Sequence, residues 1–312
     1  MRVSRRMLLN GLYLFSAFAI IYLYKWSAQS SKYKLPASTK LGWRDQQNSD
    51  SQIFQAFQDC FRPKLEPIKD NLHTFWFEFA NATKDCNNLK EYDSLDIRAA
   101  PNKDEIKYVA FPKNNDEQLT MVTLGIGHDI QAELHLKAMY PKVQFHGADP
   151  GVVVNKDLYE NKLGGSYYHY AVSGETGMQK SKVYTVRGFT LDATKHIQAD
   201  YFFKNVLNKN RIDILWMDIE QNEYGILEQI HQNGKLDQVD VKICQINVEF
   251  HKDVFGESEV EMRQFRDFVY KVLDDKKYII LKPSFAKYKT IGFVRAFIVN
   301  IADNECTNLY IK

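Results

Sequence analysis

From about residue 118 onward, short apolar runs alternate with amphipathic stretches of helix length. The apolar runs read LTMVTLGIG, KVQFHGADP, SYYHYAVSG, IDILWMDIE and VKICQINVEF. The stretches between them read QAELHLKAMY, VVVNKDLYENKL, DATKHIQADYFFKNV and QNEYGILEQIHQNG. Near-continuous apolar strands separated by helices are typical of βαβ units, in which both faces of a parallel sheet are covered. The pattern therefore predicts an α/β domain over residues 117–312.

A different pattern closes the chain. The amphipathic stretch SEVEMRQFRDFVYKVLDD predicts a long helix, and the apolar runs KKYIILKPSF and GFVRAFIVNI follow it. Only a few residues separate these two runs, which suits antiparallel strands, because a parallel pair needs a long crossover connection. We expect an antiparallel pair at one edge of the sheet.

The N-terminal residues follow neither pattern. After MRVSRR, the chain carries no charge from Met7 to Tyr24, a stretch that would span roughly 27 Å as a helix, enough to cross a membrane. We predict a cytosolic tail and transmembrane signal anchor over residues 1–26, with the arginines on the cytosolic side. A cleaved signal peptide is the alternative, although Ser27-Ala28-Gln29 is a poor cleavage site. The prediction implies a single-pass type II membrane protein of the endoplasmic reticulum or Golgi, with a lumenal main domain.

Two segments lie between the apolar N-terminus and the predicted domain. Residues 27–50 are polar and indicate a stem or linker. Residues 51–116 contain IFQAFQDCF and NLHTFWFEFA, which indicate an N-terminal helical subdomain or a cover over the main domain.

Composition supports a globular protein. Hydrophobic residues make up 45% of the chain and aromatic residues 13%. The net charge of +2 gives no sign of a nucleic-acid partner.

Four cysteines and one sequon bear on the compartment. Cys60 and Cys86 flank one short segment and can pair in an oxidising environment. Cys244 lies in an apolar run, which favours a buried free thiol, and the pattern leaves Cys306 undecided. The triplet Asn81-Ala82-Thr83 is an acceptor sequence for N-glycosylation.

Candidate cofactor-binding residues stand where the first two strands end. Gly125 and Gly127 allow close approach of a ligand, and the following helix would favour an anionic group. His128 comes next and can face the ligand or the solvent. Asp149 ends the second strand, 22 residues after Gly127, which is the spacing at which an acid holds ribose hydroxyls. Together these residues favour a nucleoside-containing ligand, although two glycines alone would also suit an ordinary turn.

Acidic residues gather after the fourth and fifth runs. Asp218 and Glu220 alternate onto one side of an extended strand, and so do Glu249 and His251 on the next. Because these strands should be neighbours, we expect Asp218, Glu249 and His251 to form a catalytic group, with His251 as a possible general base. The same residues can bind a divalent metal, but their spacing does not require one. Glu220 and Glu223 can instead favour a helix N-terminus, and Asp192 is expected to cap a helix that follows it.

Two common nucleotide-binding motifs are absent. A dinucleotide motif needs a third glycine where this chain has Ile130, and a P-loop needs a Gly-Lys-Ser/Thr ending. Class I methyltransferases use a glycine loop after the first strand, an acid after the second and an antiparallel strand at the end of the sheet. The pattern fits that class better than it fits an NAD-binding or ATP-binding protein.

The segments LGIGHDIQAE, FHGADP, YAVSG, FTLD, LWMDIEQNEYGIL and CQINVEFH resemble the FkbM-type methyltransferases, in particular a nematode-like branch with a membrane anchor. The resemblance implies a Rossmann-like fold with a seven-stranded, mostly parallel sheet and an antiparallel last strand. It also implies S-adenosylmethionine as cofactor, with Gly125 and Gly127 at its methionine end and Asp149 at its ribose. Residues around Ala171 and Val172 would flank the adenine, and Asp218 would lie near both cofactor and acceptor.

The chain departs from that family's usual pattern at the glycine loop. Thr123 stands where many members carry an acid, and His128 and Asp129 stand where small residues are usual. We expect an O-methyltransferase that acts on a hydroxyl group of a glycan or another small acceptor, without a metal. Two alternatives stay open: a lumenal glycosyltransferase that uses Asp218-x-Glu220 as a metal site, and an inactive methyltransferase-like binding protein.

Overall fold

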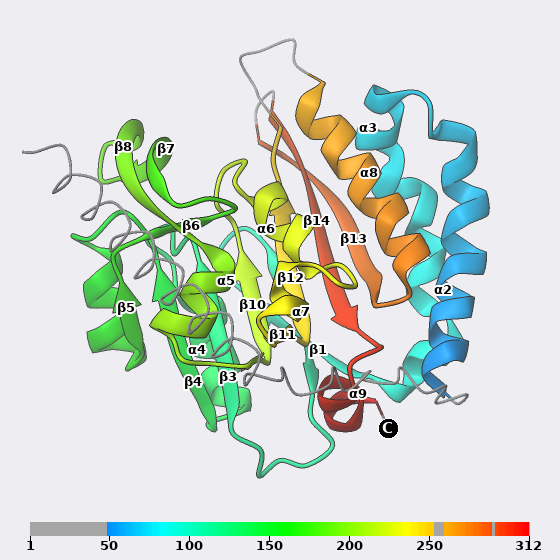
Figure 1. The fold of residues 1–312 in the computed structure, drawn as a ribbon, viewed down its shortest axis with the longest axis horizontal. Coiled ribbons are helices and arrows are strands. Elements are labelled where there is room, and N and C mark those ends of the chain that lie inside the picture. Colours follow the sequence, from blue (N-terminus) through cyan, green and yellow to red (C-terminus); the bar gives the residue numbers. More distant parts are fainter. Residues whose placement is uncertain (1–48, 253–258, 289–290, 312) are drawn as a thin grey trace, which may run out of the picture. The chain divides into compact units, whose positions relative to one another are not determined.

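A computed structural model describes residues 49–252, 259–288 and 291–311 (Figure 1). The chain divides into two units, residues 1–46 and 47–312, of which only the second is described below. The predicted membrane anchor and most of the stem lie outside the described residues. Within the described residues, no helix is both long enough and apolar enough to cross a membrane.

A seven-stranded sheet forms the centre of the domain, as the sequence predicts. Its strand order is β13-β14-β12-β10-β3-β4-β5. The five strands from β12 to β5 are parallel, and β14 runs antiparallel to both of its neighbours. The strands are β3 (Leu119–Leu124), β4 (Val143–Ala148), β5 (Ser166–Tyr168), β10 (Ile214–Met217), β12 (Gln245–Phe250), β13 (Tyr278–Tyr288) and β14 (Ile291–Asn300).

The central strands are buried because both of their faces are covered. Every residue of β3, β10 and β12 is buried, which explains their near-continuous apolar runs. One face of β12 turns Phe250 toward Phe265 and Phe268, on helix α8 (Val260–Asp275). The other face turns Gln245 and Asn247 toward a β-hairpin.

That hairpin consists of β1 (Asp96–Pro101) and β2 (Ile106–Phe111), and the hydrophobic pattern does not reveal it. The side chain of Asn247 accepts from the backbone N–H of Tyr108 at 2.8 Å. Gln245 accepts from the N–H of Ala110 at 2.7 Å and donates to its carbonyl at 3.0 Å. Two buried amide side chains of β12 therefore satisfy hydrogen-bonding groups of the hairpin backbone. The hairpin packs on this face of the sheet, where a helix is more usual.

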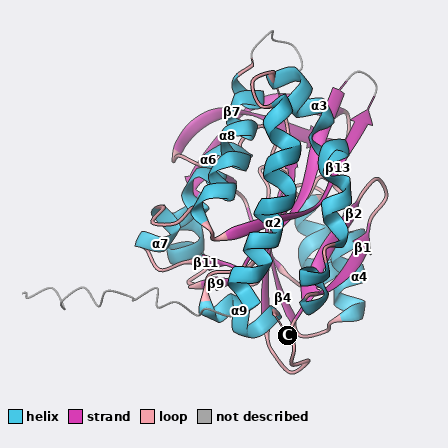
Figure 2. Cartoon of the chain, turned by 90° about the vertical axis from the view of Figure 1, so that its right-hand side faces the viewer, coloured by secondary structure: helices cyan, strands magenta, loops and turns pink. Residues whose placement is uncertain are grey.

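Helices α2 (Ser49–Leu65) and α3 (Leu72–Thr83) pack against α8 and β13, and Figure 2 shows these three helices side by side. Phe75, Trp76 and Phe79 of α3 surround Phe265, with ring centroids 5.0 to 5.8 Å apart. These helices therefore cover the sheet as part of the same compact unit, whereas residues 96–111 of the expected helical segment form the β1–β2 hairpin.

The remaining short elements connect these layers. They are η1 (Glu66–Ile68), η2 (Lys84–Asn88), η3 (Lys90–Ser94), α4 (Gln131–Met139), η4 (Asp157–Leu163), α5 (Ala199–Tyr201), η5 (Phe202–Val206), β9 (Arg211–Ile212), α6 (Glu223–Ile230), α7 (Lys235–Gln238), β11 (Lys242–Ile243) and α9 (Asn304–Tyr310).

The four cysteines form two disulfides. Cys60 and Cys86 pair, as their spacing allows. The expectation of a free thiol at Cys244 is wrong, because Cys244 pairs with Cys306. Strand β14 lies beside β12 and leads into α9. Cys306 of α9 therefore lies next to Cys244 at the start of β12, although the two cysteines are 62 residues apart in sequence.

The expectation that Asp192 caps a helix is wrong, and only residues 199–206 of the stretch after it are helical, in α5 and η5. Strands β7 (Gly177–Thr185) and β8 (Gly188–Gln198) form a long antiparallel hairpin there. Gly188 has φ of +98°, which suits the tight connection between them. With β6 (Ala171–Ser173) the hairpin makes a three-stranded sheet, so the run SYYHYAVSG is divided between two sheets.

Candidate functional site

A cavity of about 910 Å³ lies where the carboxyl ends of β3, β4 and β10 meet. This is the edge at which open parallel sheets bind ligands, and its size suits a nucleoside-sized molecule. All the residues that the sequence proposes for the cofactor line it: Gly125, Gly127, His128, Asp149, Ala171, Val172 and Asp218. Glu249 and His251 do not line the cavity but lie behind Asp218.

The glycine loop follows β3 and rests against the end of β10. Gly125 has φ of +79°, and a Cβ there would lie 1.8 Å from the carbonyl oxygen of Asp218. A side chain at this position would therefore push the two strand ends apart. Gly127, at φ of +62°, has nothing within 4 Å of such a Cβ. The first glycine is needed for packing, whereas the second leaves open space beside the cavity.

Asp149 connects the second strand to the glycine loop. One carboxylate oxygen accepts from the N–H of Ile126 at 2.8 Å, and the other accepts from the N–H of Gly151 at 2.6 Å. Burial raises the pKa of Asp149, and these backbone bonds oppose that shift. The structure thus gives Asp149 a role in shaping the loop, in addition to the ribose contact that the sequence predicts.

His128 lies at the part of the glycine loop that faces the β7–β8 hairpin. Its backbone N–H donates to the side-chain oxygen of Asn155 at 3.0 Å. Its ring lies 5.0 Å from the ring of Tyr184, which in turn lies 5.0 Å from that of Phe189. Tyr184 and Phe189 line the cavity and were missed by the sequence analysis. The alternating run KVYTVRGFTL is the signal for a hairpin that could have revealed them.

Four carboxylates surround the ring of His251, and Asp218 is one of them. The Nε2 atom of His251 lies 3.5 Å from Asp218, 3.8 Å from Glu220 and 3.2 Å from Glu249. Its Nδ1 atom lies 2.5 Å from Glu223. Neighbouring parallel strands β10 and β12 bring this group together, as the sequence predicts.

Burial and charge give these groups different protonation. The side chain of Asp218 is 42% exposed, but desolvation of its buried part and the Glu249 charge raise its pKa above the usual range. Burial alone would lower the pKa of His251, but Glu223 and the other carboxylates raise it well above its ordinary value. Burial likewise opposes ionisation of Glu249, yet His251 and Arg295 lower its pKa to about 2. The surrounding carboxylates therefore favour the charged form of His251, and its role as a general base stays a prediction.

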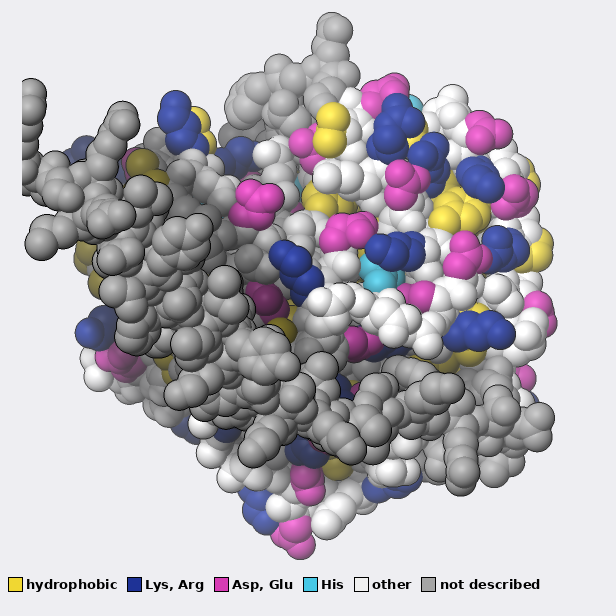
Figure 3. Space-filling view, in the orientation of Figure 1, with side chains coloured by type: hydrophobic (Ala, Val, Ile, Leu, Met, Phe, Trp, Pro, Cys, Tyr) yellow, Lys and Arg dark blue, Asp and Glu magenta, His cyan; other side chains and the backbone are white. Residues whose placement is uncertain are grey.

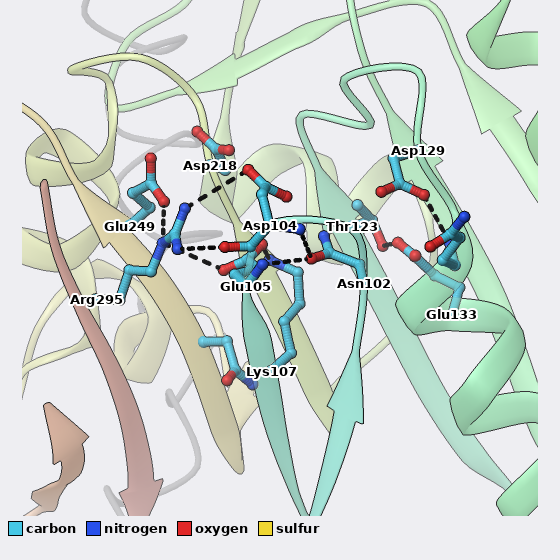
Figure 4. A network of polar contacts seen from close by, with 12 residues as sticks. Asn102, Asp104, Glu105, Lys107, Thr123, Asp129, Glu133, Asp218, Glu249 and Arg295 are labelled. Atoms are coloured by element: carbon cyan, nitrogen blue, oxygen red, sulfur yellow. Dashed lines mark hydrogen bonds and ion pairs between the residues drawn. The ribbon is translucent and has the colours of Figure 1, made fainter. Parts of the chain in front are cut away.

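A second polar layer comes from the β1–β2 hairpin (Figure 4). Arg295 of β14 contacts Glu249 and also lies 3.6 Å from Glu105, which pairs with Lys107. Burial lowers the pKa of Lys107, but Glu105 and other nearby acids raise it by more. Lys107 and Glu105 line the cavity and were missed from the sequence, because nothing local shows that residues 96–111 reach this site.

Thr123 and Glu133 meet beneath the glycine loop. The Thr123 hydroxyl donates to the carboxylate of Glu133 at 2.9 Å and accepts from the Tyr159 hydroxyl at 2.9 Å. Burial raises the pKa of Glu133 to about 7. Glu133 of α4 therefore places a carboxylate beside the threonine that replaces the family's usual acid.

Asp218, Glu220 and His251 each offer one ligand atom, and these atoms lie within 4.8 Å of one another. A divalent ion is compatible with that donor set. However, Lys182 lies 3.4 Å from Glu220, and Arg295 pairs with Glu249, so cationic side chains already face these acids. The expectation that the site works without a metal stays a prediction.

Strand order, glycine loop and acid positions together define a Rossmann-like protein of the class I methyltransferase type. The chain belongs to the methyltransferase FkbM domain family, whose model matches residues 59–298. The branch with a membrane anchor stays a prediction. No curated protein matches the chain.

Three solved structures show a weak likeness. They are TrmK of M. capricolum in complex with S-adenosyl-homocysteine (13% identity, 58% of this chain, TM-score 0.33), a 16S rRNA (adenine(1408)-N(1))-methyltransferase mutant from Catenulisporales acidiphilia (10%, 61%, 0.30), and a SAM-dependent methyltransferase from Aquifex aeolicus (10%, 60%, 0.28). The match covers 62% of the first of these chains, 93% of the second and 85% of the third. These values are too low to carry an argument, so the fold assignment rests on the strand order.

The cofactor of this family is S-adenosylmethionine, and the residues of the cavity fit it. Gly127 leaves open space beside the loop, and Asp149 is held against the loop by backbone bonds. Asp218 and Glu220 supply negative charge that complements a sulfonium cation. When bound, the cofactor supplies an activated methyl group.

Proposed function

We propose that the protein transfers a methyl group to a hydroxyl group, with Asp218 as the proton acceptor. The observation that carries this proposal is the position of Asp218. It is the member of the predicted catalytic group that lines the cavity, and its side chain is 42% exposed. It also touches the glycine loop, since its carbonyl oxygen limits position 125 to glycine. In its ionised form, a carboxylate at this position can accept the proton of a bound hydroxyl group.

Glu249 and His251 are positioning residues in this proposal. His251 is 2% exposed, and Glu223 fixes its Nδ1 atom from behind, so its Nε2 atom faces Asp218 and Glu249. A cation at this place stabilises the ionised form of Asp218 in an otherwise crowded group of acids. Methyl transfer itself needs positioning and removal of the hydroxyl proton rather than strong acid catalysis.

The proposed acceptor is a glycan or another small hydroxyl compound of the secretory pathway. Two disulfides support an oxidising compartment, and Asn81 of the glycosylation sequon is exposed. The polar cavity wall formed by Asn102, Asp104 and Glu105 offers several hydrogen-bond acceptors and donors to a polyhydroxy compound. The family assignment leaves the glycosyltransferase alternative without support.

The test is transfer of labelled methyl from S-adenosylmethionine to a panel of hydroxyl acceptors, glycans included. We expect Asp218→Asn to lower kcat by about 10²-fold to 10⁴-fold, because it removes the proton acceptor. In the parent protein the rate should fall as the pH decreases, since the proton acceptor must be ionised. Asp192→Asn, an exposed acid on β8, is the matched control and should keep full activity.

Three results would contradict the proposal. One is an Asp218→Asn variant that keeps full activity. Another is methyl transfer to nitrogen acceptors alone. The third is cofactor binding by calorimetry with no transfer to any acceptor, which would support the inactive binding protein instead.

A further inference from the structure

The β7–β8 hairpin carries an exposed apolar surface at the rim of the cavity. The exposed fractions are 68% for Met178, 40% for Tyr184, 80% for Val186, 59% for Phe189 and 64% for Leu191. These are five of the eleven exposed large hydrophobic residues in the described part of the chain. Single exposed apolar residues are ordinary, but a contiguous group on one element marks an interaction surface.

The register of the hairpin shows that four of these residues share one face. Residues that pair directly across an antiparallel ladder point to the same side. The pairs Met178 with Lys195, Lys180 with Ala193, Lys182 with Leu191, and Tyr184 with Phe189 therefore define one surface, called the hairpin face below. The alternate residues Ser181, Val183, Thr194 and His196 are buried against the molecule. The hairpin face is thus the outer side of a strand pair whose inner side is packed except at Thr190 and Asp192.

The charges of the hairpin face all have the same sign. Its charged residues are Lys180, Lys182 and Lys195, of which Lys182 lies 3.4 Å from Glu220, whereas the acid of this hairpin, Asp192, belongs to the opposite side. The surface over α3 and α8 differs, because acidic and basic side chains are mixed there (Figure 3). An apolar surface with only basic charges complements an anionic, amphipathic partner.

We propose that the hairpin face docks on a lipid bilayer that contains anionic lipids. The aliphatic and aromatic side chains would enter the headgroup region, and Lys180 and Lys195 would meet lipid phosphates. A nucleic acid suits the face less well, since Met178 and Leu191 cannot stack on bases as aromatic residues do, and the chain's net charge is only +2.

The same face reaches the functional site. Lys182, Tyr184 and Phe189 line the cavity as well as the hairpin face. A docked hairpin would therefore hold the cavity rim at the membrane surface, where the enzyme meets acceptors carried by lipids or by membrane proteins. This inference stands on the hairpin itself and holds even if the proton acceptor is not Asp218.

The test uses the full chain with an environment-sensitive fluorophore on a single introduced cysteine. All four native cysteines are in disulfides, so the added thiol is the one that reacts. One protein carries Phe189→Cys, and the control carries Ile106→Cys, an exposed apolar position on β2. Each is mixed with vesicles of phosphatidylcholine, alone or with phosphatidylserine.

We expect a blue shift of the label at position 189, stronger with phosphatidylserine, and little change at position 106. The charge reversals Lys180→Glu and Lys195→Glu together should abolish most of the blue shift of the label at position 189 in phosphatidylserine vesicles. The matched reversals Lys84→Glu and Lys90→Glu, at exposed sites of η2 and η3, should leave it unchanged. Leu191→Ser, which keeps all charges, should reduce the blue shift.

Several results would overturn the proposal. Equal shifts at positions 189 and 106 would show binding that does not involve the hairpin face. A shift that needs no lipid but rises with protein concentration would indicate a second copy of the chain. Binding to RNA oligonucleotides without an effect of vesicles would indicate a nucleic-acid surface.

Discussion

At the residue scale, the glycine loop shows how a departure from a family pattern is compensated in space. Thr123 lacks the carboxylate that many relatives carry, but its hydroxyl holds Glu133, which comes from the next helix. Position 125 requires glycine for a different reason, because the carbonyl oxygen of Asp218 occupies the space that a side chain would need. Sequence patterns identify both positions as unusual, but only contacts between elements explain them.

Gly125→Ala should disrupt both the loop and cofactor binding. The left-handed backbone costs an alanine about 1–2 kcal/mol, and the contact with Asp218 adds an overpacking term of about 1–3 kcal/mol. Gly127→Ala is the matched control, because it meets the same backbone strain in open space. Chemical unfolding and calorimetry with S-adenosylmethionine measure the two effects. Equal losses in both variants would show that the contact at Asp218 is unimportant.

The pKa of Glu133 makes stability depend on pH. Burial raises this pKa from 4.5 to about 7, so between these values the folded state binds more protons than the unfolded state, and stability falls as the pH rises. The total effect is about 3 kcal/mol at most. Glu133→Gln keeps an acceptor for Thr123 and should flatten this part of the profile. Urea unfolding at pH 5 and pH 7.5 tests this, and a parallel decline in both proteins would refute it.

At the element scale, each layer depends on a partner that is distant in sequence. Helix α3 surrounds Phe265 of α8 with three aromatic rings. The β1–β2 hairpin is hydrogen-bonded to two amide side chains of β12. The long periodic helices were predictable from their own residues. The β1–β2 hairpin was not, because short strands are defined by their pairing. The β7–β8 hairpin has an alternating run as its signal, but part of β8 is also compatible with a helix.

Phe265→Ala should lower the free energy of unfolding by about 3–5 kcal/mol, the usual loss for a buried phenylalanine. Its side chain is fully enclosed by rings from α3 and β12. Lys271→Ala on the same helix removes an exposed ion pair with Glu228 and should cost at most about 1 kcal/mol. Denaturant titration compares the variants. A loss below about 1 kcal/mol for Phe265→Ala would mean that the α3 cover contributes little.

At the scale of the whole molecule, two disulfides secure different parts of the domain. Cys60–Cys86 ties α2 to the segment after α3, and Cys244–Cys306 ties the start of β12 to the C-terminal helix. The domain is therefore constrained at its covering helices and at the end of its sheet.

The second disulfide should contribute more to stability, because it closes a longer loop. Sequence separations of 62 and 26 residues correspond to about 4.3 and 3.5 kcal/mol in the chain-entropy model. We expect the double variant Cys244→Ala/Cys306→Ala to melt at a lower temperature than Cys60→Ala/Cys86→Ala. Calorimetry in a non-reducing buffer measures this difference, and the opposite order would show that native-state packing outweighs loop entropy.

The sequence by itself determined the parallel sheet, its antiparallel edge, the residues of the glycine loop and the acids at the strand ends. These features are local, because burial imposes apolar runs and ligand-binding ends follow directly after them. The tertiary structure alone decided that Cys244 pairs with Cys306, that Glu105 and Lys107 reach the site, and that four carboxylates surround His251. Each of these depends on the electrostatic field or space provided by residues far away in the chain, which no local pattern records.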